Sequence, residues 1–202
     1  GPAMKRYAVY LIAALLTGCV SLDRVTERPA TTVYVLRDGG ATTPAAVTDP
    51  RSLLVFDSAV DAFLDSEAMA YSRAPGTLAR YQFARWSALP GKRFAELLRR
   101  RLGDSRTFAT VARAGGPVRG DLLLDTRLVA FHHDAADAPG AVVVVVEAEL
   151  IDLKKHALLV RERVEVREPA ASHDAAGAAR AFDRATGQAL DRLQTWLASV
   201  AE

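Results

Sequence analysis

The sequence predicts an α+β fold: a two-layer domain in which a mostly antiparallel sheet is covered on one face by two helices. Three segments carry this prediction. Residues 158–168 alternate apolar and charged side chains, which is typical of a strand with one buried and one solvated face. Residues 91–105 and 172–202 instead repeat apolar residues at helical spacing, so each is expected to bury one stripe against a neighbouring layer.

The first part of the expected domain consists of short strands. Residues 31–37 are rich in β-branched and aromatic residues and predict a first strand, and residues 52–58 predict a second. The Gly, Pro and Asp residues of 38–50 indicate a loop between them. Residues 68–73 and 78–86 predict two further strands, joined as a hairpin across a Pro-Gly turn.

The first helix is expected over residues 91–105, with Gly103 marking its end. The triplet Arg99–Arg101 predicts a basic spot near the end of this helix, where the helix dipole favours cations. The predicted buried stripe comprises Phe94, Leu97, Leu98 and Leu102, and the charged residues of the other faces are Lys92, Arg93, Glu96, Arg99 and Arg100.

Three longer strands and a second helix complete the expected fold. The strands are predicted over 120–131, 141–153 and 158–168, and the short link between the last two favours antiparallel pairing. Ser172 is the expected N-cap of the second helix. One face of the first strand comprises Leu122, Leu124, Thr126, Leu128 and Ala130, and the helix stripe comprises Phe182, Ala189, Leu193, Trp196 and Val200.

The first 18 residues are expected to lie outside the fold. Gly1–Ala3 precede Met4 and indicate a remnant of recombinant expression or a misplaced start. Lys5 and Arg6 are followed by about ten apolar residues and then by small residues, the pattern of a secretory signal peptide. This apolar run is too short to span a bilayer, which needs about 20 residues.

Cys19 is the only cysteine of the chain and is the predicted lipid attachment site. Residues 16–19, Leu-Thr-Gly-Cys, resemble the bacterial lipobox. In proteins with that motif the sulfur is acylated with diacylglycerol, the signal is cut before the cysteine, and the new amino end is usually acylated as well, with fatty acids such as palmitate. A disulfide within the chain is excluded, and a catalytic thiol would need a nearby base on an ordered scaffold. Two or more acyl chains anchor a protein stably.

The residues after Cys19 indicate which membrane the domain is anchored to and how far from that membrane it can lie. By resemblance to lipoprotein sorting, Val20 in place of Asp favours the outer membrane. Residues 20–30 are polar and contain a proline near their end, so they indicate a tether that reaches at most about 40 Å. The expected organisation is an expression remnant and signal peptide over 1–18, the lipidated cysteine and tether over 19–30, and a single domain over 31–202.

The net charge of +2 belongs to the signal peptide. Lys5 and Arg6 are two of the 26 basic residues, so the chain from Cys19 onward has 24 basic and 24 acidic side chains. A nucleic-acid-binding domain carries a surplus of positive charge. The composition therefore argues against a nucleic-acid partner.

No catalytic motif is found, and we expect a protein that is not an enzyme and has no metal or cofactor beyond its covalent lipid. The sequence has no GxSxG, HExxH, P-loop or dinucleotide-binding glycine pattern. The polar residues His132, His133, Asp134 and Asp137 could share a metal only from a loop, and a polar strand end is the simpler interpretation. A loose acidic series lacks the spacing of a calcium loop and is interpreted as solvated or turn residues: Asp57, Asp61, Asp65 and Glu67.

Four aromatic residues stand on the two strands of the predicted hairpin: Tyr71, Tyr81, Phe83 and Trp86. Core packing is the favoured interpretation, because aromatic residues on paired strands most often face the interior. A protein interface and a small-molecule pocket are the alternatives. For the interface, the candidate residues are Tyr71, Tyr81 and Trp86.

A series of short motifs covers nearly all of residues 31–200. They are YVL (34–36), LLVFDS (53–58), FLDSEAMAYSR (63–73) with Leu64 and Tyr71, ARWSALP (84–90) with Trp86, FAELLRRRL (94–102), FATVAR (108–113) and GDLLLDTRLVAFHHD (120–134). In order and spacing this series resembles the ABC-type transport auxiliary lipoprotein family, the group that includes paraquat-inducible protein C. The histidine pair is not a motif of that family.

The resemblance implies a lipoprotein of the outer membrane, facing the periplasm, that assists an ABC transporter of phospholipid or another hydrophobic cargo. Its implied partner is the MCE (mammalian cell entry) substrate-binding protein, which is served by an inner-membrane permease and ATPase. On this hypothesis Cys19 holds the domain at the membrane, and the sheet edge or the Tyr/Trp strands meet the partner. The alternative is a direct lipid-binding carrier of the cell envelope, which would need an enclosed apolar cavity. Self-association into a homo-oligomer stays open.

Overall fold

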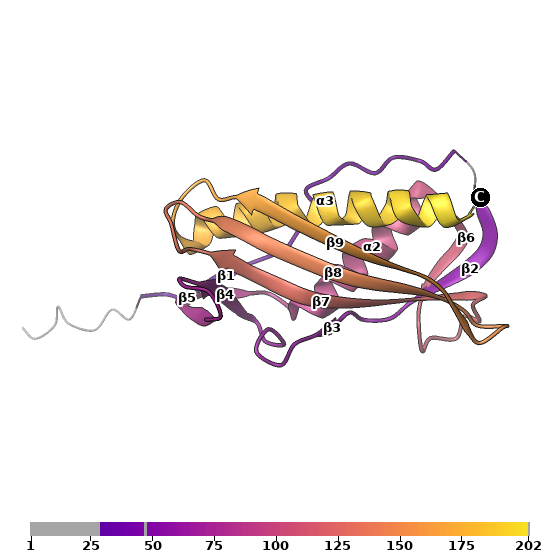
Figure 1. The fold of residues 1–202 in the computed structure, drawn as a ribbon, viewed down its shortest axis with the longest axis horizontal. Helices are drawn as coiled ribbons and strands as arrows, with labels where there is room; N and C mark the ends of the chain where they lie inside the picture. Colours follow the sequence, from indigo (N-terminus) through magenta and orange to yellow (C-terminus); the bar gives the residue numbers. More distant parts are fainter. Residues whose placement is uncertain (1–28, 47, 202) are drawn as a thin grey trace, which may run out of the picture. The chain divides into compact units, whose positions relative to one another are not determined.

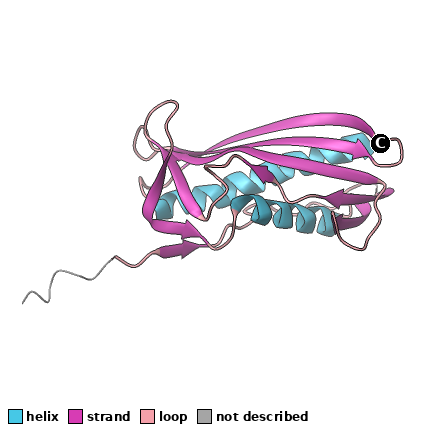
Figure 2. Cartoon of the chain, turned by 90° about the horizontal axis from the view of Figure 1, so that it is seen from below, coloured by secondary structure: helices cyan, strands magenta, loops and turns pink. Residues whose placement is uncertain are grey.

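The computed structural model describes residues 29–46 and 48–201. Thr31–Glu202 form one compact unit, to which all elements below belong. Its described part contains one nine-stranded sheet and two helices, α2 (Pro90–Ser105) and α3 (Ala175–Ala201). Figures 1 and 2 show both helices on the same side of the three longest strands, which confirms the α+β fold. Neither helix of the described residues combines the length and apolarity that a membrane crossing needs.

The three longest strands form an antiparallel meander, as their alternation predicts. They are β7 (Leu122–Asp134), β8 (Ala141–Asp152) and β9 (Ala157–Pro169), and β8 pairs along almost its whole length with both neighbours. Every second residue is apolar and buried over most of β8, while charged residues of β9 point to the solvent. The apolar face of this meander forms one wall of the core.

A bulge in β7 shifts its alternation. Leu128 and Ala130 pair with consecutive residues of β8, so Val129 is the extra residue. Up to Leu128 the even-numbered residues are buried, whereas beyond the bulge Phe131 and His133 are buried. The prediction that Ala130 shares the face of Leu128 is therefore wrong, because an inserted residue moves all later side chains to the other face.

Three short strands that follow one another in the chain pair with the other edge of β7. The paired segments are β2 (Asp49–Val55), β3 (Ala59–Val60) and β4 (Ala68–Ser72), and all three run parallel to β7. The sheet is therefore mixed: its long ladders are antiparallel, as predicted, and its short ones are mostly parallel. With only two residues, β3 is too short to leave a pattern in the sequence, and it is not among the predicted strands.

Three more strands extend the sheet. β6 (Phe108–Arg113) lies beside β2, β5 (Ala79–Trp86) beside β4, and β1 (Thr32–Tyr34) beside β5. The β4–β5 pair is the predicted antiparallel hairpin. β6 is also absent from the predicted strands, because its residues are largely exposed and show no regular alternation.

The predicted helix stripes form the other wall of the core. All four stripe residues of α2 are buried, and on α3 the residues Phe182, Ala189 and Leu193 are fully buried. At the centre, Phe182 lies 4.4 Å from Phe131 on β7 and 5.3 Å from Trp86 on β5, measured between ring centroids. This aromatic cluster joins α3 to both parts of the sheet.

The predicted range 91–105 agrees with α2, but the residues predicted to end α2 and to cap α3 are wrong. Asp174, not Ser172, caps α3: its Oδ1 accepts the Gly177 amide at 2.7 Å, and Ser172 only supports it by donating to the same oxygen. Helix α2 continues past Gly103 to Ser105, and the next residue, Arg106, adopts the left-handed conformation with φ of 56°. Asp174 therefore caps α3 in place of the predicted Ser172. The left-handed Arg106 follows the end of α2, where Gly103 was the predicted end marker.

The prediction of a basic spot at the end of α2 is wrong for Arg101. Its side chain is completely buried, and it joins the loop after β1 to α3. Nε and Nη2 donate to the carboxylate of Asp38 at 2.9 and 2.5 Å, and Nη1 donates to Asp191. The two neighbouring arginines are also paired, Arg99 with Asp57 and Arg100 with Glu96, so the triplet is not the exposed cluster of unpaired cations that the sequence predicted.

Candidate functional site

The two tyrosines of the predicted interface lie together, but the tryptophan does not reach the surface. Tyr71 on β4 and Tyr81 on β5 are half-buried, with their ring centroids 4.8 Å apart. Trp86 is 2% exposed and packs against Phe131 and Phe182. The core interpretation is therefore correct for Trp86, and its place in a partner interface is wrong, because its ring contacts the helix layer.

A buried histidine holds Tyr81. The Nε2 atom of His133 lies 3.0 Å from the carbonyl oxygen of Pro139, and its Nδ1 atom lies 2.7 Å from the Tyr81 hydroxyl. A carbonyl can only accept, so Nε2 carries the proton and Nδ1 accepts from Tyr81. Burial lowers the pKa of His133 and raises the pKa of Tyr81 to about 12, so both groups are neutral near pH 7. This network fixes the hairpin to β7.

The other polar candidates do not converge on a site. His132 and His133 point to opposite faces of β7, as expected for neighbours on a strand. Asp134 pairs with Arg167 at 2.5 Å, which lowers the pKa of its carboxyl group. In the described part of the chain, no three His, Cys, Asp or Glu side chains are grouped to hold a metal ion. Members of the acidic series pair with arginines instead: Asp57 with Arg99 and Arg113, Asp61 with Arg127, and Glu67 with Arg85.

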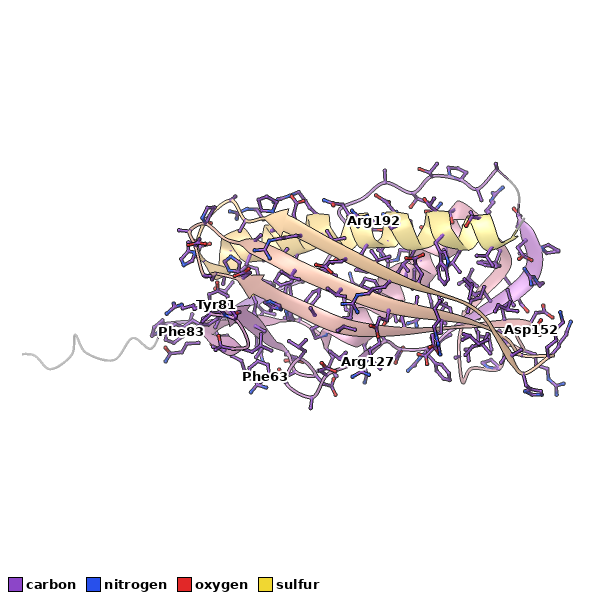
Figure 3. The ribbon with its side chains drawn as sticks, in the orientation of Figure 1. Phe63, Tyr81, Phe83, Arg127, Asp152 and Arg192 are labelled. Atoms are coloured by element: carbon purple, nitrogen blue, oxygen red, sulfur yellow. The ribbon has the colours of Figure 1, made fainter. Side chains whose placement is uncertain are left out.

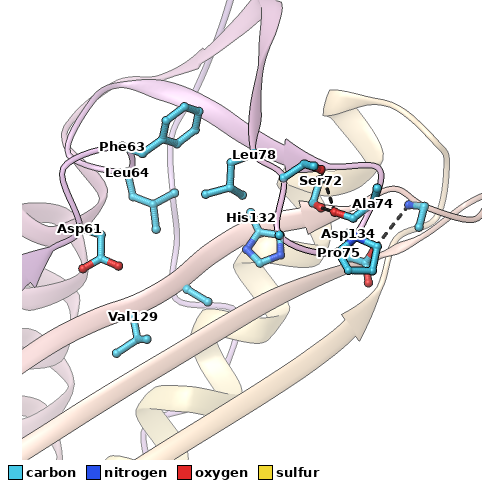
Figure 4. Close-up of a pocket in the computed structure, with 14 residues that line it drawn as sticks. Asp61, Phe63, Leu64, Ser72, Ala74, Pro75, Leu78, Val129, His132 and Asp134 are labelled. Carbon is cyan, nitrogen blue, oxygen red and sulfur yellow. Dashed lines mark hydrogen bonds between the residues drawn. The ribbon is translucent and has the colours of Figure 1, made fainter.

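A cleft of about 520 Å³ lies beside β7 on the face of the sheet that the helices leave free (Figure 4). Residues of three segments line it: Asp61, Phe63 and Leu64 before β4, Ser72 and residues 74–78 of the hairpin, and Val129, Ala130, His132 and Asp134 of β7. Burial lowers the pKa of His132, so its imidazole is neutral near pH 7. The volume falls within the range of ligand pockets, about 300–1,000 Å³. The cleft is open to solvent and is not the enclosed cavity that a direct lipid carrier would need.

Paired charges join β8 and β9 on the helix-free face. Arg161 and Arg163 of β9 reach across to Glu149 and Glu147 of β8, with N–O distances of 2.7 and 2.5 Å. Exposed pairs of this kind contribute only about 0–1 kcal/mol each to stability. Each pair is electrically neutral, which agrees with the balanced composition of the chain from Cys19 onward.

Exposed apolar side chains gather around the β4–β5 hairpin. Phe63 and Leu78, at the cleft, are 36% and 41% exposed, and Phe83 on β5 is 41% exposed. Figure 3 shows Phe63 and Phe83 at the end of the sheet away from Asp152. The pairing of β5 with β4 is irregular between Arg80 and Arg85, which places Phe83 outside the regular alternation.

The sequence analysis grouped Phe83 with the other aromatics and did not predict its exposure. One signal was present: Tyr81, Phe83 and Trp86 cannot all share a face of a regular strand, because the last of them has the opposite parity.

Cys19, the predicted lipid attachment site, lies outside the described residues, as do the predicted signal peptide and nearly all of the tether. The described residues of the compact unit begin at Thr31, directly before β1.

Comparison with known proteins gives a family and a fold. A family model described as "ABC-type transport auxiliary lipoprotein component" matches residues 34–194. A crystal structure from Xanthomonas campestris, assigned to the family DUF330, is 26% identical with a TM-score of 0.75, and the match covers 82% of this chain and 94% of that one. A second crystal structure, of an uncharacterized protein, is 14% identical with a TM-score of 0.65 and 83% and 99% coverage, and it shows the fold alone. The comparison with curated proteins gives no match.

Proposed function

Because this chain belongs to the ABC-type transport auxiliary lipoprotein component family, we propose that it assists a lipid transporter. In this role it is a lipoprotein anchored in the outer membrane, and it docks the MCE substrate-binding protein of that transporter in the periplasm. The observation that carries this proposal is the family match over residues 34–194, which extends from β1 into the last turns of α3. The proposed role is positional and needs no catalytic centre.

The proposed anchor is the lipid on Cys19. Leu16 to Cys19 supply the thiol and the small residues that lipoprotein processing requires, and about ten apolar residues precede them. Residues 20–30 extend at most about 40 Å, so a domain that begins at Thr31 stays near the membrane surface. This position suits a protein that receives or presents a periplasmic partner.

Cys19→Ala is expected to abolish the incorporation of labelled palmitate and to remove the chain from the outer-membrane fraction. Two or more acyl chains anchor a protein stably, and without the thiol no diacylglycerol can be attached. Metabolic labelling and density-gradient fractionation measure both effects. Ser21→Ala, two residues away, serves as the matched control and should label and fractionate like the unchanged chain. Palmitate incorporation that persists in Cys19→Ala contradicts the anchor.

Docking of the MCE protein is tested with photoreactive residues in cells that express the whole transporter. Arg161 lies on β9, which pairs only with β8 and so forms an edge of the described sheet, and Arg127 of β7 lies on the helix-free face. Lys155 in the β8–β9 turn is an exposed control. An edge strand is a common docking site for a partner chain, so we expect Arg161 to crosslink to the MCE protein and Lys155 not to. The absence of MCE crosslinks from both Arg161 and Arg127 contradicts docking on this face.

A further inference from the structure

Large apolar side chains are exposed around the point where the predicted tether joins the domain. In the parallel β1–β5 pairing Thr32 lies opposite Ala84, so the chain enters the sheet next to Phe83. Together with three arginines of the hairpin, these apolar residues form what we call the tether-side surface. The apolar members, each between 36% and 48% exposed, are Val33, Val35, Phe63, Leu78 and Phe83, and the basic members are Arg73, Arg80 and Arg85.

Contacts link these residues into one surface. Phe63 and Leu78 line the same cleft. The guanidinium carbon of Arg80 lies 4.4 Å from the centre of the Phe63 ring, and Arg80 also lines a shallow hollow with Phe83. On the far side, Arg85 pairs in register with Val33 of β1. These contacts connect the cleft, through the β4–β5 hairpin, to the strand that follows the tether.

The charge of the hairpin has one sign. Residues 71–85 contain three arginines and no acidic residue. Arg85 has a loose partner in Glu67 at 3.5 Å, whereas Arg73 and Arg80 have no carboxylate partner among the residues that the structure describes. Their guanidinium groups lie over aromatic rings instead, Arg73 over Tyr71 at 5.1 Å. Apolar rings with adjacent basic groups suit the boundary between acyl chains and anionic headgroups.

We propose that the tether-side surface rests on the anionic lipid surface in which the chain is anchored. Phe83 and Leu78 then lie at the acyl boundary, and Arg73 and Arg80 lie at the headgroup phosphates. The inference depends on the proposed lipid at Cys19, because the tether brings this end of the domain to the membrane. A tether alone leaves the domain free to turn, whereas the added contact orients it. The end with Asp152 then points away from the lipid (Figure 3).

The test places the full lipidated chain in vesicles of phosphatidylethanolamine and phosphatidylglycerol whose acyl chains carry bromine, which quenches tryptophan on contact. Phe83→Trp keeps an aromatic ring in the surface. Leu158→Trp, at a position of similar exposure (43%) near the β8–β9 turn, is the matched control. We expect emission from Phe83→Trp to be quenched beyond the background of Trp86 and Trp196, and emission from Leu158→Trp to stay at that background. Equal quenching in both variants overturns the proposal.

A charge variant tests the headgroup contact. In the Phe83→Trp background, Arg80→Gln is expected to lower the equilibrium constant for membrane contact about fivefold, because one basic residue near an anionic surface is lost. Lys155→Gln, at an exposed residue of the β8–β9 turn, should leave it unchanged. Equal effects of the two substitutions contradict the headgroup contact.

Two further outcomes separate the alternatives. If emission from Phe83→Trp responds to added MCE protein and not to brominated lipid, the surface is a protein interface and the proposal fails. Recovery of the chain with the vesicles tests the anchor: a recovered but unquenched chain overturns this inference alone, whereas an unrecovered chain overturns the anchor on which it depends.

Discussion

Phe182→Ala is expected to lower the free energy of unfolding by about 4 kcal/mol. Phe182 is fully buried, and its ring contacts Phe131 of β7 and Trp86 of β5. Truncation removes the apolar contacts that join α3 to two parts of the sheet and leaves a cavity among rigid neighbours. Urea titration followed by circular dichroism measures the loss.

A conservative variant makes the Phe182 result interpretable. Phe182→Leu keeps most of the apolar volume and should cost less than about 1.5 kcal/mol. Ser199→Ala, at an exposed position near the end of the same helix, should stay within about 0.5 kcal/mol of the unchanged protein. A loss below about 1 kcal/mol for Phe182→Ala would show that the cluster does not carry the packing described above.

Asp38→Ala is expected to destabilise the domain more than Arg101→Met does. The side chain of Arg101 is 0% exposed, whereas those of Asp38 and Asp191 are 22% and 49% exposed. Removal of Asp38 leaves a buried guanidinium with only one carboxylate, which costs about 3 kcal/mol. Arg101→Met instead fills the site with an apolar side chain and leaves two carboxylates that water reaches, so its cost is about 1 kcal/mol.

Urea titration of both variants gives the order of the two effects. The exposed pair between Arg85 and Glu67 supplies the control, and Glu67→Ala should change the free energy of unfolding by less than about 1 kcal/mol. An Arg101→Met variant that is less stable than Asp38→Ala would mean that the contribution of this cluster comes from packing of the arginine stem rather than from its charge.

The sequence was informative where burial on one face dominates a long segment. β9 and both helices repeat apolar residues at one period, β7 does so up to its bulge, and β8 begins with a run of apolar residues, so their positions and buried faces were predicted with few errors. The parallel pairing of β2, β3 and β4 with β7 was not predictable in the same way. This pairing joins segments that are far apart in the chain, and their local sequence does not determine which edge of β7 they pair with.

The same distinction applies to the candidate site. Arg101 was assigned to an exposed basic spot, and Trp86 was named as an interface candidate beside the favoured core interpretation, yet tertiary partners bury both side chains. The cleft depends on three segments that meet only in the fold, and the exposure of Phe83 depends on an irregular pairing in β5. Residue spacing shows only that Phe83 and Trp86 cannot share a face of a regular strand, and it contains neither the meeting of the three segments nor the position of the irregular pairing.

The hydrogen bonds between the two ends of the domain determine when folding can be completed. Ser52 bonds to Asp121, 69 residues away, and the amide of Arg37 bonds to Asp183 across 146 residues. Gln194 of α3 donates to the carbonyl of Thr43 across 151 residues. Contacts of such long sequence separation slow folding, because the chain loses loop entropy before they form. The loop between β1 and β2 therefore gains its hydrogen bonds to α3 only after the last helix of the domain has been made.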